Sequence, residues 1–304
     1  MDLKKVKNLD LHLHTTASDG SYTPAVMLSR VKEAGIGLFA LTDHDTVKGC
    51  REIAGLLTDG DPFFLTGAEF SCKDEEGKYH ILGYGFDPDA ASVTGLIKLG
   101  HGYRVAKALA RLEFLKNEFG FVFTDAEIDE LFRKNSPGKP HIGALMVKHG
   151  YAESVSAAIN GFINKKHFSE EHVRPEEAIG AILAGGGIPV LAHPPYGSGE
   201  EYVFGEDMER RLTKLTRFGL RGVEAFYSLY TPKVRGEMLY FADRFGLLAT
   251  AGSDSHGENK GGTPPGSTGL PGPEDYPPAL LGFLDEVSPK VYRPRPADPG
   301  GEKT

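Results

Sequence analysis

Residues 6–45 read VKNLDLHLHTTASDGSYTPAVMLSRVKEAGIGLFALTDHD, and this stretch decides the fold. An apolar run at 6–13 predicts a strand, Pro24 is placed to begin a helix that Gly35 ends, and the run at 38–42 predicts a second strand. Strand, helix and strand in this order are typical of a parallel sheet or barrel. The sequence therefore predicts an α/β protein.

The same alternation continues on both sides of a central helical region. We expect the following further elements: helix 47–57, strands 63–69 and 79–84, helix 175–183, strand 188–192, helix 207–218, strand 222–226, helix 232–245 and strand 247–251. The region between them has helical periodicity at 96–118, 125–132, 140–149 and 154–163, without a convincing strand. We therefore expect a closed or nearly closed barrel from residues 1–95 and 176–257, with a helical insert at 96–175. The order of the strands stays open.

The C-terminal segment, residues 258–304, has a different composition. It holds 10 of the chain's 20 prolines. Such a composition argues against regular structure, apart from a turn of helix at 279–286. We expect a loosely attached Pro/Gly-rich tail.

The composition excludes some classes of protein. Lys and Arg number 34 against 42 Asp and Glu, a net charge of −8, so a protein that grips nucleic acid mainly by neutralising many phosphates is not expected. No apolar run reaches the roughly 18 to 20 residues of a membrane span, and the N-terminus lacks the features of a secretory signal. Cys50 and Cys72 cannot make a disulfide framework and are expected to be buried thiols. We expect a cytoplasmic protein with no membrane contact and no disulfide-linked partner.

Metal-binding residue types follow the predicted strands, where the reactive groups of an α/β barrel collect. His12 and His14 lie two apart on a strand, so both rings point to one face and can share an ion. Asp254 and His256 have the same spacing. The other candidates at or near strand ends are Asp19, His44, Glu69, His80 and His193.

This donor set predicts the kind of metal and the chemistry. Imidazoles with carboxylates suit Zn, Mn or Fe better than Ca or Mg. Nine ligands are too many for one ion, so we expect two or three divalent transition-metal ions a few ångströms apart. Such ions would form a bridging hydroxide at neutral pH while binding the oxygens of a phosphoryl group. The set therefore predicts hydrolysis.

The ordered motifs resemble those of the PHP (polymerase and histidinol phosphatase) family, and are closest to its stand-alone bacterial phosphoesterases. They are Asp10-Leu-His12-Leu-His14-Thr-Thr-Ala-Ser18-Asp19-Gly20, Thr42-Asp43-His44-Asp45-Thr46, Gly67-Ala-Glu69, His80-Ile-Leu-Gly-Tyr84, Ala192-His193-Pro194 and Gly252-Ser-Asp254-Ser-His256. The match covers roughly residues 6 to 257. It implies a distorted (β/α)7 TIM-like barrel with a trinuclear metal centre.

The resemblance also implies how the ligands divide among the ions. The first ion would take His12, His14, Glu69 and Asp254, the second Glu69, His80 and His193, and the third Asp19, His44 and His256. Asp19 stands where some relatives have histidine, and an oxygen ligand there is expected to change the metal preference of the third site.

The activity implied is that of a phosphoric monoester hydrolase, in which a metal-bridging hydroxide attacks phosphorus. Glu69 would set the metal spacing, and the acid for the leaving group would be a water on the third metal, His193 or His256. A nucleotide such as a nucleoside 3′,5′-bisphosphate is the leading substrate class. The alternatives are L-histidinol phosphate, 5′-3′ trimming of short RNA, and a PHP module without catalysis.

The resemblance implies that the helical insert covers the metal centre and helps to select the substrate. Its run Gly138-Lys139-Pro140-His141-Ile142 resembles an Arg-Pro-His-Ile motif with lysine in place of arginine, which replaces a bidentate donor with a point charge. The substrate-binding candidates are Arg104, Lys139, His141, Lys165 and Tyr227. The plainer interpretation is that the basic residues lie on solvated helix faces, that His141 caps its helix and that Tyr227 packs in the barrel.

Overall fold

The computed structural model describes residues 2–134, 137–166, 171–197 and 202–292. The chain divides into two compact units. The first, here called the barrel unit, consists of Met1–Thr94 and Arg174–Thr304, and the second, the helical unit, consists of Gly95–Val173. In the described part of the chain, we find no helix with the length and apolar character needed to cross a membrane.

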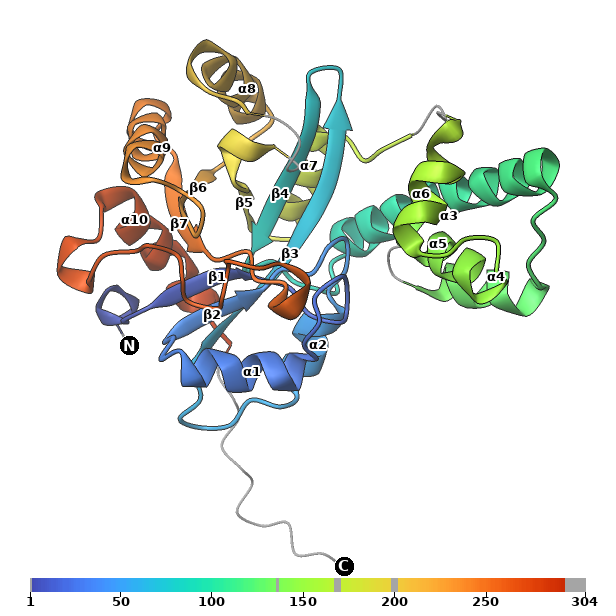
Figure 1. Cartoon of the computed structure of the whole chain (residues 1–304). Helices are drawn as coiled ribbons and strands as arrows, with labels where there is room; N and C mark the ends of the chain where they lie inside the picture. The colour runs from blue at the N-terminus through green and yellow to red at the C-terminus, as the bar shows by residue number, and fades with distance from the viewer. Residues whose placement is uncertain (1, 135–136, 167–170, 198–201, 293–304) are drawn as a thin grey trace, which may run out of the picture. The chain divides into compact units, whose positions relative to one another are not determined.

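The barrel unit is built on one seven-stranded sheet whose spatial order follows the chain, β1 to β7 (Figure 1). The strands are β1 (Leu9–Leu13), β2 (Leu38–Leu41), β3 (Phe63–Asp74), β4 (Gly77–Tyr84), β5 (Ile188–Leu191), β6 (Gly222–Tyr227) and β7 (Leu248–Gly252). The two outer strands approach each other, because Leu13 bridges Ser255 and the Asp254 N–H donates to the His12 carbonyl at 2.8 Å. The predicted α/β barrel is confirmed.

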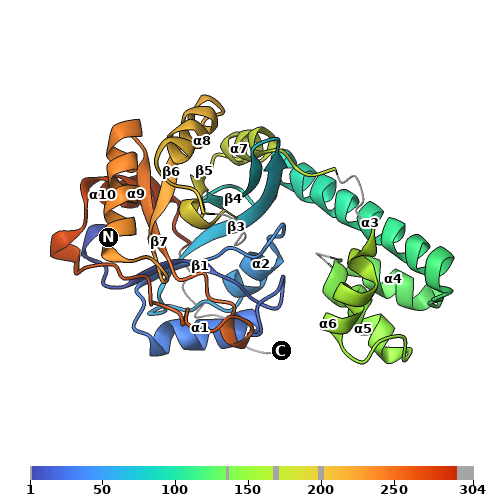
Figure 2. The same cartoon turned by 45° about the horizontal axis from the view of Figure 1, so that its top comes forward.

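Helices surround these strands (Figure 2). They are α1 (Pro24–Glu33), α2 (Lys48–Ala54), α7 (Pro175–Ala184), α8 (Gly205–Arg217), α9 (Pro232–Phe245) and α10 (Pro278–Val287). Helix α1 begins as the sequence predicts, since the Thr23 side chain accepts from the Val26 N–H and Pro24 occupies the first turn. Its buried face, with Met27 and Val31, packs in an apolar cluster with residues of β1 and β2.

The third strand is longer than predicted. It does not end at Glu69 but continues to Asp74, and it pairs with β4 as an antiparallel hairpin. Gly77 has φ +140°, a conformation that suits glycine and lets the chain reverse within a short turn. Because no helix separates β3 from β4, these two strands are antiparallel. Strand β4 also runs antiparallel to β5, while the other neighbouring strands are parallel.

The segment after residue 257 is not loosely attached, which corrects our expectation for its described part. Helix α10 packs on β7, and its apolar side chains Leu280, Phe283, Leu284 and Val287 are buried. The Gly266 N–H donates to Asp10 Oδ2 at 2.7 Å, and the Tyr276 hydroxyl donates to the Val6 carbonyl at 2.8 Å. Proline and glycine here shape turns between anchored residues. Residues 293–304 of the predicted tail lie outside the described residues.

The helical unit has a core of its own. Its helices are α3 (Ala91–Phe119), which begins within the barrel unit, α4 (Asp125–Arg133), α5 (Lys139–Lys148) and α6 (Val155–Gly161). The buried residues that hold them together are Ala108, Leu112, Leu115, Phe123, Leu131, Ile142, Met146, Ala158 and Ile163. The contacts divide the chain at Gly95 and Val173, close to the insert boundaries expected from the sequence.

Candidate metal centre

Six of the seven strands bring predicted ligands together in the barrel unit. His12 lies in β1, and His14 and Asp19 follow it; His44 follows β2; Glu69 lies in β3 and His80 in β4; His193 follows β5; and Asp254 and His256 follow β7. The remaining strand, β6, carries Glu224 and Tyr227, which contact these residues. All nine predicted ligands therefore lie in one cluster.

Glu69 lies at the centre of this cluster and is 1% exposed. Imidazole nitrogens surround both of its oxygens: Oε1 lies 2.8 Å from His80 Nδ1 and 3.3 Å from His193 Nε2, and Oε2 lies 3.3 Å from His12 Nε2, 3.2 Å from His14 Nε2 and 3.3 Å from His44 Nδ1. A carboxylate in this position can serve two ions at once. The backbone supports it, since the Asp45 N–H donates to the Glu69 carbonyl at 2.9 Å.

The cluster divides into four overlapping groups whose ligand atoms lie within 4.8 Å of one another. They are His12–His14–Asp254, His12–Glu69–His193, His44–Glu69–His80 and His14–Asp19–His44–His256. The last group is the most open, because the Asp19 side chain is 54% exposed. Its carboxylate lies 3.5 Å from His256 Nε2 and 3.8 Å from His44 Nε2.

The charges in the cluster oppose the effect of burial. Burial alone would raise the pKa of Glu69, but His80 and His44 lower it well below its usual range. Burial would lower the pKa of His14, yet the neighbouring carboxylates of Asp254 and Glu69 raise it to about 10. At His44 burial prevails and lowers the pKa to about 4. The carboxylates beside His14 thus favour a positive charge at this position. A divalent ion bound there would also supply that charge.

Several buried polar atoms of the cluster make no hydrogen bond within the described residues. They are His12 Nε2, both ring nitrogens of His14, His44 Nδ1, His80 Nδ1, His193 Nδ1 and Glu69 Oε2. Buried polar groups normally have a partner, because leaving them unpaired costs about 1–3 kcal/mol each. Imidazole nitrogens and carboxylate oxygens converging in this way are the donor set of transition metals. The residues fit divalent metal ions.

The backbone around the cluster is strained. Asp45, His193 and Asp254 have φ values of +53°, +27° and +57°, in the left-handed region that side chains other than glycine rarely adopt. Such strain is concentrated at functional sites, where it aims a side chain. Gly252 allows the close approach of β7 to β1, since a Cβ there would lie 2.2 Å from the His12 Cβ.

Glu224 is a supporting residue that sequence reasoning missed. It is fully buried in β6, with Oε1 2.9 Å from His12 Nδ1, and its Oε2 accepts the His193 N–H at 2.8 Å. If His12 carries its proton on Nδ1, it would donate this proton to Glu224. The other ring nitrogen, Nε2, would then face the other ligands. The available signal was an acidic residue inside the otherwise apolar run Gly222–Tyr227.

Tyr227 and Lys260 contact the cluster from another side. The Tyr227 hydroxyl donates to Asp254 Oδ2 at 3.0 Å, and Lys260 Nζ also donates to this oxygen. Tyr227 is 3% exposed, which agrees with the packing in the barrel that the sequence left as its alternative to substrate binding. Lys260 lies in the segment predicted as a tail, and no sequence signal marked it.

Two predicted substrate residues make local contacts in the helical unit. Lys139 Nζ donates to Asn164 Oδ1 at 2.7 Å. His141 Nδ1 accepts the Gly138 N–H at 3.3 Å, which caps α5, and burial lowers the pKa of this histidine. The structure thus gives His141 the capping role that the sequence left as its alternative.

The other two basic candidates also lie in the helical unit. Lys165 Nζ sits over the rings of Phe119 and Phe162, at 5.3 and 5.6 Å from their centroids. Arg104 lies on α3 and is half-buried. These four residues are therefore on a different unit from the metal cluster, and their role toward a substrate stays a prediction.

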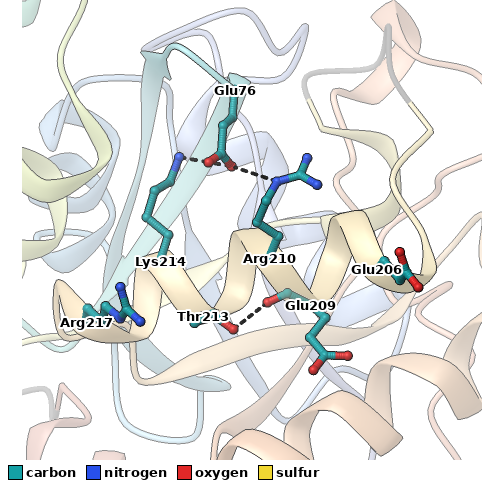
Figure 3. Close-up of a pocket in the computed structure, with 7 residues that line it drawn as sticks. All are labelled: Glu76, Glu206, Glu209, Arg210, Thr213, Lys214 and Arg217. Carbon is teal, nitrogen blue, oxygen red and sulfur yellow. Dashed lines mark hydrogen bonds and ion pairs between the residues drawn. The ribbon is translucent and has the colours of Figure 1, made fainter.

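A separate cavity of about 660 Å³ lies between α8 and the tip of the β3–β4 hairpin (Figure 3). In its lining, Glu76 faces Lys214 at 3.1 Å and Arg210 at 3.9 Å. None of the nine predicted ligands lines it. The size of a cavity therefore does not identify the site here, whereas the convergence of ligand atoms does.

Comparison with known proteins agrees with this geometry. The PHP domain family model matches residues 10–181. The 3′,5′-nucleoside bisphosphate phosphatase of Chromobacterium violaceum is 29% identical over 294 residues, which cover 94% of this chain and 99% of the relative. The phosphoribosyl 1,2-cyclic phosphate 1,2-diphosphodiesterase of Eggerthella lenta is 31% identical over 258 residues, or 82% of this chain and 94% of the relative.

Two solved structures have the same fold over nearly the whole chain. An amidohydrolase from Chromobacterium violaceum, with sulfate and no metal bound, aligns with a TM-score of 0.73 and 27% identity over 95% of this chain and 98% of its own. A protein assigned as a metal-dependent phosphoesterase from Bifidobacterium adolescentis aligns with a TM-score of 0.70 and 26% identity over 91% of this chain and 96% of its own. The family match covers more than half of the sequence and includes the strands that carry most of the ligands, so the chain belongs to the PHP domain family.

Proposed function

We propose that this protein is a metal-dependent phosphoesterase that hydrolyses the phosphate monoester of a small molecule. The observation that carries the proposal is the convergence of nine imidazole and carboxylate side chains into overlapping groups around Glu69. The names of its relatives support a substrate with a phosphate ester.

Two or three divalent ions, Mn, Zn or Fe, would be held by these nine side chains. His12, His14 and Asp254 would hold one ion, His80 and His193 a second and Asp19, His44 and His256 a third, with Glu69 between the first two. When bound, the ions supply positive charge to the phosphoryl oxygens and lower the pKa of a water molecule to near neutrality.

The chain's own residues orient the substrate and move a proton. Glu69 keeps the groups on its two sides at a set spacing, because its two oxygens face different imidazoles. The leaving oxygen needs a proton, which would come from a water molecule at the third ion or from whichever of His193 and His256 does not hold an ion. His256 is held by a contact of 3.0 Å between its Nδ1 and the Asp254 carbonyl, so its Nε2 faces the more open, Asp19 side of the cluster.

The substrate class we propose is a nucleoside 3′,5′-bisphosphate. The name of the Chromobacterium violaceum relative, which matches over 94% of this chain, supports it. Lys139, Arg104 and Lys165 of the helical unit are the residues we assign to its second phosphate. L-Histidinol phosphate and short 5′-phosphorylated RNA are the alternatives.

The test measures the products formed from a panel of substrates with Mn²⁺ supplied: inorganic phosphate from the monoesters, the ring-opened monoester from the cyclic phosphate and mononucleotides from the RNA. The metal content is determined on the same sample. The panel holds adenosine 3′,5′-bisphosphate, 3′-AMP, 5′-AMP, L-histidinol phosphate, a ribose 1,2-cyclic phosphate and a short 5′-phosphorylated RNA. We expect the bisphosphate to react at least about a hundredfold faster than the others, which equals about 2.7 kcal/mol of discrimination in the transition state.

Other results would redirect the proposal in defined ways. A hundredfold preference for another member would replace the substrate class and keep the chemistry. Full phosphatase activity in a protein that has lost all bound metal would overturn the metal-dependent mechanism. Hydrolysis of amides or lactones without phosphatase activity would contradict the reaction class.

A further inference from the structure

The two oxygens of the Asp254 carboxylate face different surroundings. Oδ1 faces the metal cluster: it lies 3.6 Å from His12 Nε2, 3.3 Å from His14 Nε2 and 3.4 Å from His256 Nδ1. Oδ2 instead accepts hydrogen bonds from the Tyr227 hydroxyl at 3.0 Å and from Lys260 Nζ. One oxygen is thus directed to the imidazoles, and the other is engaged by two donors.

The two donors support each other. Lys260 Nζ also donates to the Tyr227 hydroxyl at 3.2 Å, so the lysine, the tyrosine and Asp254 form a closed set of three contacts. Tyr227 is held almost fully buried at the end of β6, while the Lys260 side chain is 34% exposed. A buried hydroxyl and a cation on the same oxygen make this contact stronger than a single neutral hydrogen bond.

The backbone of Asp254 keeps the carboxylate in this orientation. Its φ of +57° is maintained by its N–H, which donates to the His12 carbonyl at 2.8 Å. Its carbonyl in turn accepts from Thr263 Oγ1 at 3.3 Å. The backbone of Asp254 is therefore constrained. The conformational freedom that its side chain keeps is the rotation of the carboxylate.

We infer that Tyr227 and Lys260 are positioning residues that occupy Oδ2 of Asp254 and leave Oδ1 as its one oxygen for a metal ion. The consequence is metal selectivity. Ca²⁺ takes about 6–8 oxygen ligands and readily accepts both oxygens of a carboxylate, whereas Zn²⁺ is usually four-coordinate. Restricting Asp254 to one oxygen favours the small transition-metal ion over Ca²⁺. This inference rests on the metal centre of the proposed function.

The experiment measures the dissociation constants of Zn²⁺ alone and Ca²⁺ alone on the metal-free full-length protein, by titration against a chelating indicator. Tyr227→Phe keeps the buried ring and removes one donor, and Lys260→Met removes the other. We expect each to raise the affinity for Ca²⁺ relative to Zn²⁺ by about tenfold, the effect typical of lost support around a ligand. Lys260→Arg should restore the original ratio.

A matched control separates position from charge. Lys32→Met also removes one lysine that pairs with a carboxylate, Asp61, but this pair involves none of the ligands. It should leave the ratio unchanged.

Three results would count against the inference. Tighter binding of both ions by the same factor in Lys260→Met, with no change in Tyr227→Phe, would mean that the lysine acts by charge alone. An unchanged ratio in both variants, with Zn²⁺ binding intact, would overturn the inference and leave the proposed function standing. Absence of Zn²⁺ binding by the unaltered protein would overturn both.

Discussion

The barrel unit and the helical unit use polar side chains in opposite ways. In the barrel unit, His12, His14 and Glu69 are buried, and His12 Nε2, both ring nitrogens of His14 and Glu69 Oε2 make no hydrogen bond within the described residues. In the helical unit, polar side chains cap helices or pair at the surface, as Glu127 does with Thr124 and Lys148. All four candidate metal groups found among the described residues lie in the barrel unit. What marks the candidate site is the convergence of several buried ligand atoms, whereas the polar groups of the helical unit that pair locally support its structure.

The two units also differ in how far apart in sequence their partners lie. The capping box of α4 joins residues three positions apart. The contact between His12 and Glu224 in the barrel joins residues 212 positions apart. Substitutions in the two units should therefore affect different measurements, and four predictions test this difference.

The largest effect is expected for His14→Ala, because His14 belongs to two of the four candidate metal groups. We expect kcat/KM to fall about a thousandfold or more and the metal content to drop, while circular dichroism shows a folded protein. The matched control is His149→Ala, a histidine of the helical unit that pairs with Glu127. Retained turnover in purified His14→Ala would remove His14 from the site.

A smaller effect is expected for Glu224→Gln. The amide keeps one acceptor oxygen, so it can serve either His12 Nδ1 or the His193 N–H but not both. Metal affinity should fall about 10–100-fold, as measured by competition with a chelator. Glu286→Gln, which alters an exposed partner of Arg221, is the control. Equal metal affinity in the two variants would leave Glu224 with a packing role only.

The helical unit should affect substrate binding alone. The double variant Lys139→Ala/Lys165→Ala is expected to raise KM for adenosine 3′,5′-bisphosphate about tenfold, with kcat and metal content unchanged. Lys116→Ala, an exposed lysine on α3, serves as the control. An unchanged KM would show that these lysines act only through Asn164, Phe119 and Phe162.

The smallest effect is expected for Glu127→Gln, which tests a local structural contact. Hydrogen bonds from Lys148 and from the Thr124 N–H lower the pKa of Glu127 below its ordinary value of 4.5. A lowered pKa in the folded state stabilises the protein above pH 4.5, and this stabilisation is lost as the pH falls below that value. Hydrogen exchange of α4 and α5 should therefore be faster in the variant at pH 7, and the difference should shrink in acid. Phosphatase activity at pH 7 should not change.

The sequence revealed those parts of the fold that depend on local pattern. Helix α1 begins at Pro24 as predicted, because a capping threonine and a proline act within one turn. The sequence predicts a strand only over 63–69, because the continuation of β3 to Asp74 depends on its pairing with β4. The attachment of α10 was also missed, since prolines and glycines can shape turns in a packed segment as well as in a loose one.

The residues of the candidate site can likewise be divided into those that the sequence could predict and those that it could not. The pair His12/His14 could be predicted, because residues two apart on an extended chain share a face. Asp254 and His256 have the same spacing but follow β7, where Asp254 leaves the extended conformation, and they join different ligand groups. Glu224 could have been noticed as an acidic residue in an apolar strand. Lys260 could not, because a lysine in a polar, glycine-rich segment has no distinguishing pattern.

By itself, the sequence determined the alternation of strands and helices, the separate helical insert and the nine side chains suited to transition metals. These follow from periodicity and residue chemistry, which act over a few residues. Only the tertiary structure decided the order of the strands, the groups in which the ligands meet and the division of the Asp254 carboxylate between the imidazoles and the Tyr227–Lys260 pair. Those features depend on contacts between segments far apart in the chain, and the packing of the whole barrel brings these segments together.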